Sequence, residues 1–266
     1  MITPFDVQQA EALSTEAGWN QTRQDWQRLI DLAPDGCFGA SADGKLVSTT
    51  VALVYGKPLA WIGMVLTTES QRGKGYARNL LRQALDYVDA AGVTCTKLDA
   101  TDQGRPVYAK LGFIDERPVA RWHRDPSPSQ AQAPPTEKTI DFQLDREAFG
   151  VDRSKLLRDL AQHQIYSIPG KGFALARPGR HAWHFGPCVA RAGATAEALL
   201  MAFLARHGEE PSVLDFCEDN DDAMRIAAGA GYQPRRRLIR MYRGDKRGIP
   251  LAASPLIYAM AGFEAG

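Results

Sequence analysis

A segment with two glycines, lying between a strand-like run and a helical pattern, constrains the fold of this chain more than any other feature. Residues 61–66 (WIGMVL) are apolar over the length of a strand. Residues 71–75 (QRGKG) follow, and apolar side chains then recur at helical spacing from Leu80 to Val88. This order aims backbone N–H groups and the positive end of a helix dipole at one place. It predicts a phosphate or pyrophosphate site, with a plain surface turn as the alternative.

The residue order in this segment excludes two common phosphate loops. A Walker A loop needs G-x-x-x-x-G-K-[ST], and a dinucleotide loop needs a third glycine with an acidic partner. The chain instead has Q-R-G-K-G-Y-A at residues 71–77 and a second motif, Y-A-K-L-G-F, at residues 108–113. Together these resemble the acetyl-CoA pyrophosphate loop, Q/R-x-x-G-x-G/A, and the Y-x-K-L-G-F segment of the GNAT N-acetyltransferase superfamily. The resemblance covers about the first 122 residues.

The order of expected elements around these motifs also resembles the GNAT fold. A first helix has Val7, Ala10 and Leu13 on one face, and Asn20 or Thr22 is expected to cap a second helix that buries Trp26. The elements expected after these are strands at 37–41, 45–55 and 59–66, a helix from about 77, a strand at 94–100, a short helix at 107–111 and a strand at 116–122. We therefore expect an α/β (α+β) fold with a mixed, mostly antiparallel twisted sheet flanked by helices.

The second half of the chain repeats this pattern in a weaker form. Residues 125–138 are rich in Pro, Ser and Gln and predict a linker. Beyond it, Leu214-Asp215 matches Leu98-Asp99, and Gly231-Tyr232 matches Gly112-Phe113. The predicted domains are an N-terminal GNAT acetyltransferase domain (1–124), the linker (125–138) and a degenerate C-terminal GNAT-like domain (139–266). The second glycine loop is reduced to residues 191–194 (RAGA), so we do not expect this half to bind CoA normally.

The resemblance implies acetyl-CoA as the co-substrate and assigns residues to hold it. The loop residues would cradle the pyrophosphate: Gln71, Arg72, Gly73, Lys74, Gly75, Tyr76 and Ala77. The strand edge at Val65, Leu66 and Thr67 would pair with the pantetheine arm, where the family's strand separates from its neighbour. A backbone N–H group at that point would polarise the thioester carbonyl.

The resemblance also implies a general acid but leaves the general base open. Tyr108 stands at the family's tyrosine position, and a phenol with a pKa near 10 is protonated at neutral pH. The alternative is that its ring only packs against the loop helix. Glu69 and Asp99 are both candidates for the base, although either carboxylate is equally explained as a solvated or capping group. Trp19, in a Gly-Trp-Asn turn, is a candidate for lining the acceptor pocket.

Composition and charge exclude several other classes of protein. A net charge of +1 gives no general attraction for nucleic acid, and no apolar run reaches the length of a membrane span. No secretory signal pattern precedes the first helix, so we expect a cytoplasmic protein with its four cysteines reduced. His181 and His184 lack accompanying ligands, so no metal site is expected. The basic run at residues 235–237 is expected either to meet an anionic partner or to be a solvated strand edge.

The leading hypothesis is an acyl-CoA-dependent N-acyltransferase that moves acetyl to the amine of a small molecule by direct attack. One alternative is transfer of another acyl group, or transfer involving a carrier protein in a biosynthetic pathway. Another is a non-catalytic CoA-binding or scaffold protein. The apolar tail at residues 251–263 is expected to return and cover the sheet or an acceptor pocket. The expected assembly is a monomer or a homodimer, with no nucleic acid or membrane partner.

Overall fold

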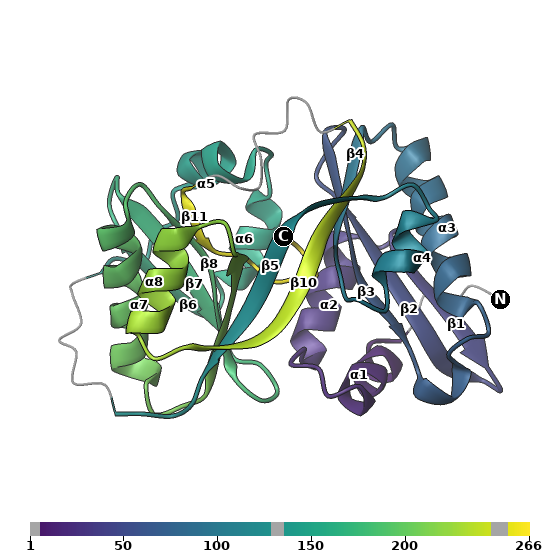
Figure 1. Ribbon diagram of the computed structural model, residues 1–266, viewed down its shortest axis with the longest axis horizontal. Coiled ribbons are helices and arrows are strands. Elements are labelled where there is room, and N and C mark those ends of the chain that lie inside the picture. Colours follow the sequence, from purple (N-terminus) through teal and green to yellow (C-terminus); the bar gives the residue numbers. More distant parts are fainter. Residues whose placement is uncertain (1–5, 129–135, 246–254) are drawn as a thin grey trace.

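The computed structural model describes residues 6–128, 136–245 and 255–266, and it has two similar halves joined by one continuous sheet (Figure 1). The first half contains α1 (Val7–Glu16), α2 (Arg23–Leu32), β1 (Cys37–Ala42), β2 (Lys45–Val54), β3 (Leu59–Thr67), the 3-10 turn η1 (Glu69–Gln71), α3 (Tyr76–Ala90), β4 (Cys95–Ala100), α4 (Arg105–Ala109) and β5 (Ile114–Arg124). Every element expected from the sequence in this half is present.

The second half repeats the same order of elements. It contains α5 (Phe142–Phe149), α6 (Ser154–Leu160), β6 (Gln164–Ile168), β7 (Gly172–Arg177), β8 (Trp183–Ala190), α7 (Gly193–His207), β9 (Ser212–Cys217), α8 (Asp221–Gly229), β10 (Gln233–Gly244) and the additional short strand β11 (Ile257–Ala259). Two helices, three strands, a long helix, a strand, a short helix and a strand thus occur twice. The expected fold class of two mixed, mostly antiparallel units is confirmed.

Local sequence explains where several of these elements begin and turn. Thr22, and not Asn20, caps α2, where it forms a capping box with Asp25. Asp43 and Gly44 both have positive φ, 50° and 75°, as the tight turn of a β-hairpin requires. The four cysteines are free thiols, with Cys37 half-buried and the others buried.

The last strands of the two halves are exchanged, which the sequence did not predict. The strand order is β1-β2-β3-β4-β10-β5-β9-β8-β7-β6, so β10 inserts between β4 and β5. Each final strand therefore pairs with the preceding strand of the other half: β10 with β4, and β5 with β9. Figure 1 shows β5 and β10 running side by side between the two halves. The domain boundaries proposed near residues 124 and 139 divide the sequence into two halves, but both halves contribute strands to one continuous sheet.

The exchanged strands carry two matching buried ion pairs. Arg240 on β10 donates from Nε and Nη2 to the two carboxylate oxygens of Asp99, at 2.9 and 3.0 Å. Arg121 on β5 donates in the same bidentate way to Asp215, at 2.7 Å for each bond. Each arginine follows the glycine of its own half's final helix by the same interval, since Gly112 precedes Arg121 and Gly231 precedes Arg240. The two halves are therefore connected by equivalent contacts in both directions.

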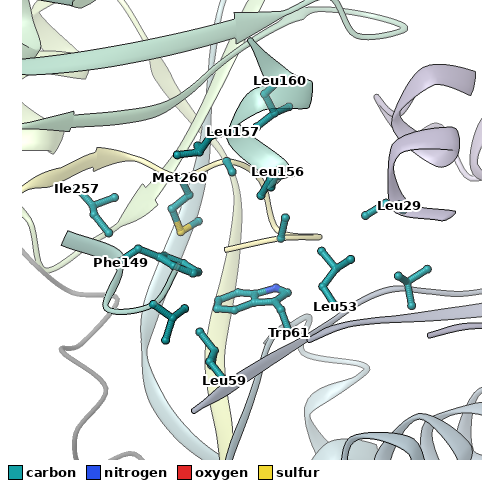
Figure 2. Close-up of a cluster of buried hydrophobic side chains, with 14 of the residues drawn as sticks. Leu29, Leu53, Leu59, Trp61, Phe149, Leu156, Leu157, Leu160, Ile257 and Met260 are labelled. Carbon is teal, nitrogen blue, oxygen red and sulfur yellow. The ribbon is translucent and has the colours of Figure 1, made fainter. Parts of the chain in front are cut away.

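Three hydrophobic clusters support this arrangement, and the largest joins the two halves. One cluster packs α3 on the first part of the sheet, and a second packs α7 and α8 on the other part. The third contains Trp26 and Trp61 from the first half with Phe149 and Met260 from the second. Figure 2 shows Trp61 beside Phe149 and Met260 in this shared core. The described residues include no helix that is both long and apolar enough to cross a bilayer.

Candidate active site

The first half opens a cleft because β3 and β4 separate. The two parallel strands pair only at Leu59 with Cys95, Ala60 with Thr96 and Trp61 with Lys97. Beyond these residues β3 continues beside β2, while β4 continues beside β10. A cavity of about 560 Å³ opens where they diverge. Its walls on this side come from β3, β4, α4 and the turn between β4 and α4: Ile62, Gly63, Met64, Val65, Asp99, Thr101 and Tyr108.

A β-bulge shapes β3 at the mouth of this cleft. Thr49 lies opposite Leu66 and Val51 lies opposite Gly63, so β3 carries one residue more than β2 between these pairs. Met64 has a φ of 53°, a backbone conformation that residues other than glycine rarely adopt. The Thr49 hydroxyl donates to the Met64 carbonyl at 2.8 Å and so helps hold the bulge. Because a bulge removes a residue from the regular ladder, backbone groups near Val65 are available to a ligand.

The glycine loop between β3 and α3 has the geometry of an anion site. Gly73 and Gly75 have φ values of 79° and 86°, and a Cβ atom built on Gly73 would meet no atom within 4 Å. Gly75 is the N-cap of the 15-residue helix α3, and no side chain caps the helix there. Arg72 and Lys74 are exposed beside it. The uncapped N–H groups, the helix dipole and the two cations fit a pyrophosphate group.

Tyr108 reaches the cleft from the one-turn helix α4. It lines the cavity and is 8% exposed, and its ring packs edge-on against Phe113 with centroids 6.1 Å apart. Burial raises the pKa of the Tyr108 phenol, so the hydroxyl stays protonated at neutral pH. A Cβ atom on Gly104 would lie 2.7 Å from the Tyr108 ring, so this glycine leaves room for the ring. The Tyr108 ring therefore both packs against its neighbours and reaches the cavity, which the sequence analysis had treated as alternatives.

Neither carboxylate suggested as a general base is well placed for that role. Both oxygens of Asp99 accept hydrogen bonds from Arg240, and the Asp99 side chain is fully buried. Burial raises the pKa of Asp99, and the charge of Arg240 opposes this increase. Glu69 is exposed on η1, and it is not among the residues that line the cavity. The geometry argues against both hypotheses, and Asp99 is better explained as half of a structural ion pair.

The opposite wall of the cavity comes from segments that are distant in the sequence. Trp19 lies there, as proposed for an acceptor pocket. Asn20 and Gln21, which follow Trp19 in the turn between α1 and α2, also line this wall. Its other residues could not be anticipated from local pattern, because they come from β5 and the residue after it, β10, the loop before β8 and the C-terminal segment: Arg121, His123, Asp125, His181, Arg235, Arg236, Phe263 and Glu264. The described part of the tail, from Pro255 onward, returns to the sheet as expected, and residues 251–254 lie outside the described residues.

The second half builds the same cleft and fills it with its own chain. Strands β8 and β9 pair only at Trp183 with Ser212 and His184 with Val213 before they separate. The short strand β11 then pairs with β8, and the Met260 N–H donates to the Asp215 carbonyl of β9 at 2.7 Å. A Cβ atom on Gly186 would lie 2.0 Å from the Met260 carbonyl oxygen. The C-terminal segment thus occupies the space that stays open in the first half.

The described part of the second half also lacks the two-glycine loop and the tyrosine of the first. Phe113 N–H donates to the Tyr108 carbonyl, and Tyr232 N–H donates to the Ala227 carbonyl in the same way. Ala227 therefore occupies the position in the second half that Tyr108 occupies in the first. The loop before α7 contains a single glycine, Gly193. Within the described residues, the second half therefore shows no counterpart of the anion loop or of the tyrosine.

Comparison with known proteins assigns both halves to one family. Residues 6–113 match the acetyltransferase (GNAT) family, and residues 142–253 match an acetyltransferase (GNAT) domain. The chain therefore belongs to the GNAT acyltransferases and carries two GNAT domains in tandem. The suspected tandem arrangement is confirmed, as is membership of an enzyme family that transfers acyl groups.

Several similar proteins align with this chain over most of their length. The uncharacterized N-acetyltransferase YitH of Bacillus subtilis is 26% identical over 76% of each chain. The holothin acyltransferase of Pseudoalteromonas is 24% identical over 93% of this chain and 87% of its own. A putative acetyltransferase of Pyrococcus horikoshii has the same fold, with a TM-score of 0.86 at 23% identity over 100% of this chain and 95% of its own. Within the described residues, no group of three or more His, Cys, Asp or Glu side chains is arranged to hold a metal.

Proposed function

We propose that the first half binds acetyl-CoA and transfers its acetyl group to the amine of a small molecule. The observation that carries this proposal is the combination of three features around β3. The bulge at Met64 and the phenol of Tyr108 line the cavity, and the glycine loop at residues 71–77 connects the end of β3 to the N-terminus of α3. They match, in order, a thioester carbonyl, a leaving thiolate and a pyrophosphate.

In the proposed reaction, the acceptor nitrogen attacks the thioester carbonyl carbon, and a C–N bond forms as the C–S bond breaks. The helix N-terminus and the loop amides hold the pyrophosphate, while the edge of β3 at residues 65–67 pairs with the amide-containing pantetheine arm. Backbone donors at the bulge stabilise the charge that develops on the carbonyl oxygen. Tyr108 gives a proton to the departing sulfur, the proton lost from the nitrogen passes to solvent, and solvent returns a proton to the Tyr108 phenolate. Because the pKa of the phenol is raised, Tyr108 carries that proton throughout the neutral range.

Tyr108→Phe is the most direct test of this mechanism. It removes the proton donor and keeps the ring that packs on Phe113, so acetyl-CoA affinity should change little. We expect kcat for release of free CoA thiol to fall by about 100-fold or more. The matched control is Tyr87→Phe, which removes a phenol on α3 outside the cavity and should leave kcat unchanged. Equal activity of Tyr108→Phe and the native protein would refute the assigned role.

Two alternatives remain distinguishable by experiment. One relative is named an acyltransferase and not an acetyltransferase, which keeps transfer of another acyl group, or transfer involving a carrier protein, as the second candidate. A panel of acyl-CoA esters read by thiol release would show a preference for a longer chain if that candidate is correct. A binding-only role would give acetyl-CoA binding in a calorimetric titration without thiol release for any amine.

A further inference from the structure

The charges that line the cavity are mostly paired within the protein. The Glu264 carboxylate accepts from Arg177 at 2.8 Å and from Gln21 at 3.2 Å. Arg121 is held by Asp215, and Asp99 is held by Arg240. His123 lies 3.5 Å from the carboxylate of Asp125. These groups therefore contribute little net charge to a ligand in the cavity.

Arg235 and Arg236 are different, because neither has an ion-pair partner among the described residues. Both line the cavity, and both are exposed to it. Arg236 lies directly opposite Arg121 in the β5–β10 pair, where two like charges face each other on neighbouring strands. Partial burial and the charge of Arg121 lower the pKa of Arg236, and Asp215 offsets only part of this effect. The protein thus presents two cations whose charge it does not neutralise.

A bulge in β10 directs both arginines to the same cavity. In a regular strand, consecutive side chains point to opposite faces of the sheet. Here the register slips, because Pro234 lies opposite Trp122 and Arg236 lies opposite Arg121, which leaves Arg235 as an extra residue. The next residue in the run, Arg237, leaves the cavity and pairs with Glu218. The basic run therefore divides into two cavity arginines and one structural arginine.

Glu264 also lines the cavity, but its charge is paired within the protein. The backbone of Glu264 packs on Gly63, since a Cβ atom there would lie 2.7 Å from the Glu264 Cα. Gly63 precedes the bulge residue Met64, so the Glu264 backbone lies beside the bulge, while the Glu264 carboxylate is paired with Arg177. Among the described carboxylate and guanidinium groups that line the cavity, Arg235 and Arg236 are thus the ones without an ion-pair partner.

We propose that the acceptor is an amine that also carries an anionic group, a carboxylate or a phosphate, which Arg235 and Arg236 bind. The inference rests on the proposed function for the position of the amine. Guanidinium groups bind both kinds of anion through charge-assisted, often bidentate hydrogen bonds. A neutral alkylamine of the same length would leave both arginines without a partner.

The experiment uses a series of unbranched amines of equal length whose far end is a methyl, a hydroxyl, a carboxylate or a phosphate. Binding to the full chain is measured by ligand-detected NMR, with and without acetyl-CoA, and thiol release is measured in parallel. We expect the carboxylate or phosphate members to bind about 10- to 100-fold more tightly than the methyl member. The better of the two anions identifies which group the acceptor carries.

The substitutions Arg235→Gln and Arg236→Gln, made together, should remove this preference and leave the weak binding of the methyl member within about twofold of the native value. Arg237→Gln is the matched control and should retain the full preference, because its partner is Glu218. Equal binding of neutral and anionic members, no binding of either anion, or a preference that survives the double substitution would overturn the inference. Selective binding of an anionic amine without any thiol release would instead support the inference and refute the proposed reaction.

Discussion

In both halves of the molecule a parallel pair of strands separates after two or three residues, at Trp61 in β3 and at His184 in β8. Two residues beyond each separation stands a glycine, Gly63 or Gly186, against which the C-terminal segment packs its backbone. The first cleft nevertheless keeps an open cavity with a glycine loop and a tyrosine. The second is filled by β11 and has Ala227 in place of the tyrosine.

This difference shows what an open strand edge requires. An unpaired edge exposes backbone donors and acceptors that must find partners. In the second half β11 supplies them, through its pairing with β8 and through the bond from Met260 N–H to the Asp215 carbonyl. In the proposed reaction the amide groups of pantetheine supply them in the first half. The short strand β11 therefore occupies the second cleft in the way that a ligand arm is expected to occupy the first.

The first prediction concerns the glycine loop at residues 71–77, which has no counterpart in the described part of the second half. Gly73→Glu and Gly75→Glu place side chains at φ values near 80° and add negative charge where the pyrophosphate would lie. We expect calorimetric titration with acetyl-CoA to show a loss of affinity of at least about 100-fold. Ala192→Glu, at the exposed equivalent position before α7, should have no effect. If Ala192→Glu weakened acetyl-CoA binding as much, the assignment of the ligand to the first half would be wrong.

The second prediction concerns the two ion pairs that connect the halves. Asp99→Asn leaves Arg240 buried with a neutral partner, which should lower the free energy of unfolding by about 3–5 kcal/mol in urea titration. Asp215→Asn should lower the free energy of unfolding by less, because the Arg121 side chain is 14% exposed and reaches solvent through the cavity. The control is Asp89→Asn, which removes an exposed partner of Arg243 and should cost about 0–1 kcal/mol. A small cost for Asp99→Asn would mean that Asp99 has a role other than this pair.

The third prediction concerns the two glycines that meet the C-terminal segment. Gly186→Ala and Gly63→Ala each force a methyl group into the backbone of that segment, at 2.0 Å from the Met260 oxygen and 2.7 Å from the Glu264 Cα. We expect each substitution to lower the free energy of unfolding by about 1–3 kcal/mol. Only Gly63→Ala should also reduce turnover, because Glu264 lines the open cavity. Gly229→Ala, where a Cβ atom meets nothing within 4 Å, is the control for stability. Equal losses of turnover in both variants would show that the segment acts on the cavity as a whole.

The sequence predicted those parts of the fold and site that depend on local pattern. The glycine loop, Tyr108 and the strand edge at residues 65–67 could be proposed as site residues because each stands in or beside a short local motif, and their roles stay predictions. Each half also repeats the order of elements, so Leu98-Asp99 and Leu214-Asp215 could be matched.

The exchange of β5 and β10 could not be predicted, because each strand fits its own half equally well by pattern. The exchanged arrangement is distinguished by long-range contacts such as the pairing of Arg121 with Asp215 and of Arg240 with Asp99, and those partners lie 94 and 141 residues apart. For the same reason the sequence could not reveal that Asp99, proposed as a candidate base, pairs with Arg240. Glu264 and Arg236 were not recognised as cavity residues, because a β-bulge and a returning segment place them there.

The fourth prediction concerns His184 in the filled cleft of the second half and the response of stability to acid. His184 occupies the position of Trp61, and it lies 3.9 Å from Asp215 and beside the Met260 carbonyl. Burial lowers the pKa of His184 well below its usual value, and the charges of Arg177, Arg121 and Arg28 act in the same direction, while the hydrogen bond with the Met260 carbonyl opposes them. The folded protein therefore keeps His184 neutral at pH values where the unfolded chain, with a pKa near 6.5, binds a proton.

Below about pH 6.5 the unfolded state binds more protons than the folded state at this site, so its contribution to stability is lost as the pH falls. The limiting slope for one group is about 1.4 kcal/mol per pH unit. His184→Gln should remove this pH dependence of the free energy of unfolding. Values from urea titration of the native protein and of the variant should therefore differ by a constant above about pH 7 and converge below pH 6.5. His181→Gln, at an exposed residue, should follow the native curve. Parallel curves for His184→Gln and the native protein would mean that His184 is not held neutral by the packed segment, and that the second cleft is less tightly closed than its contacts indicate.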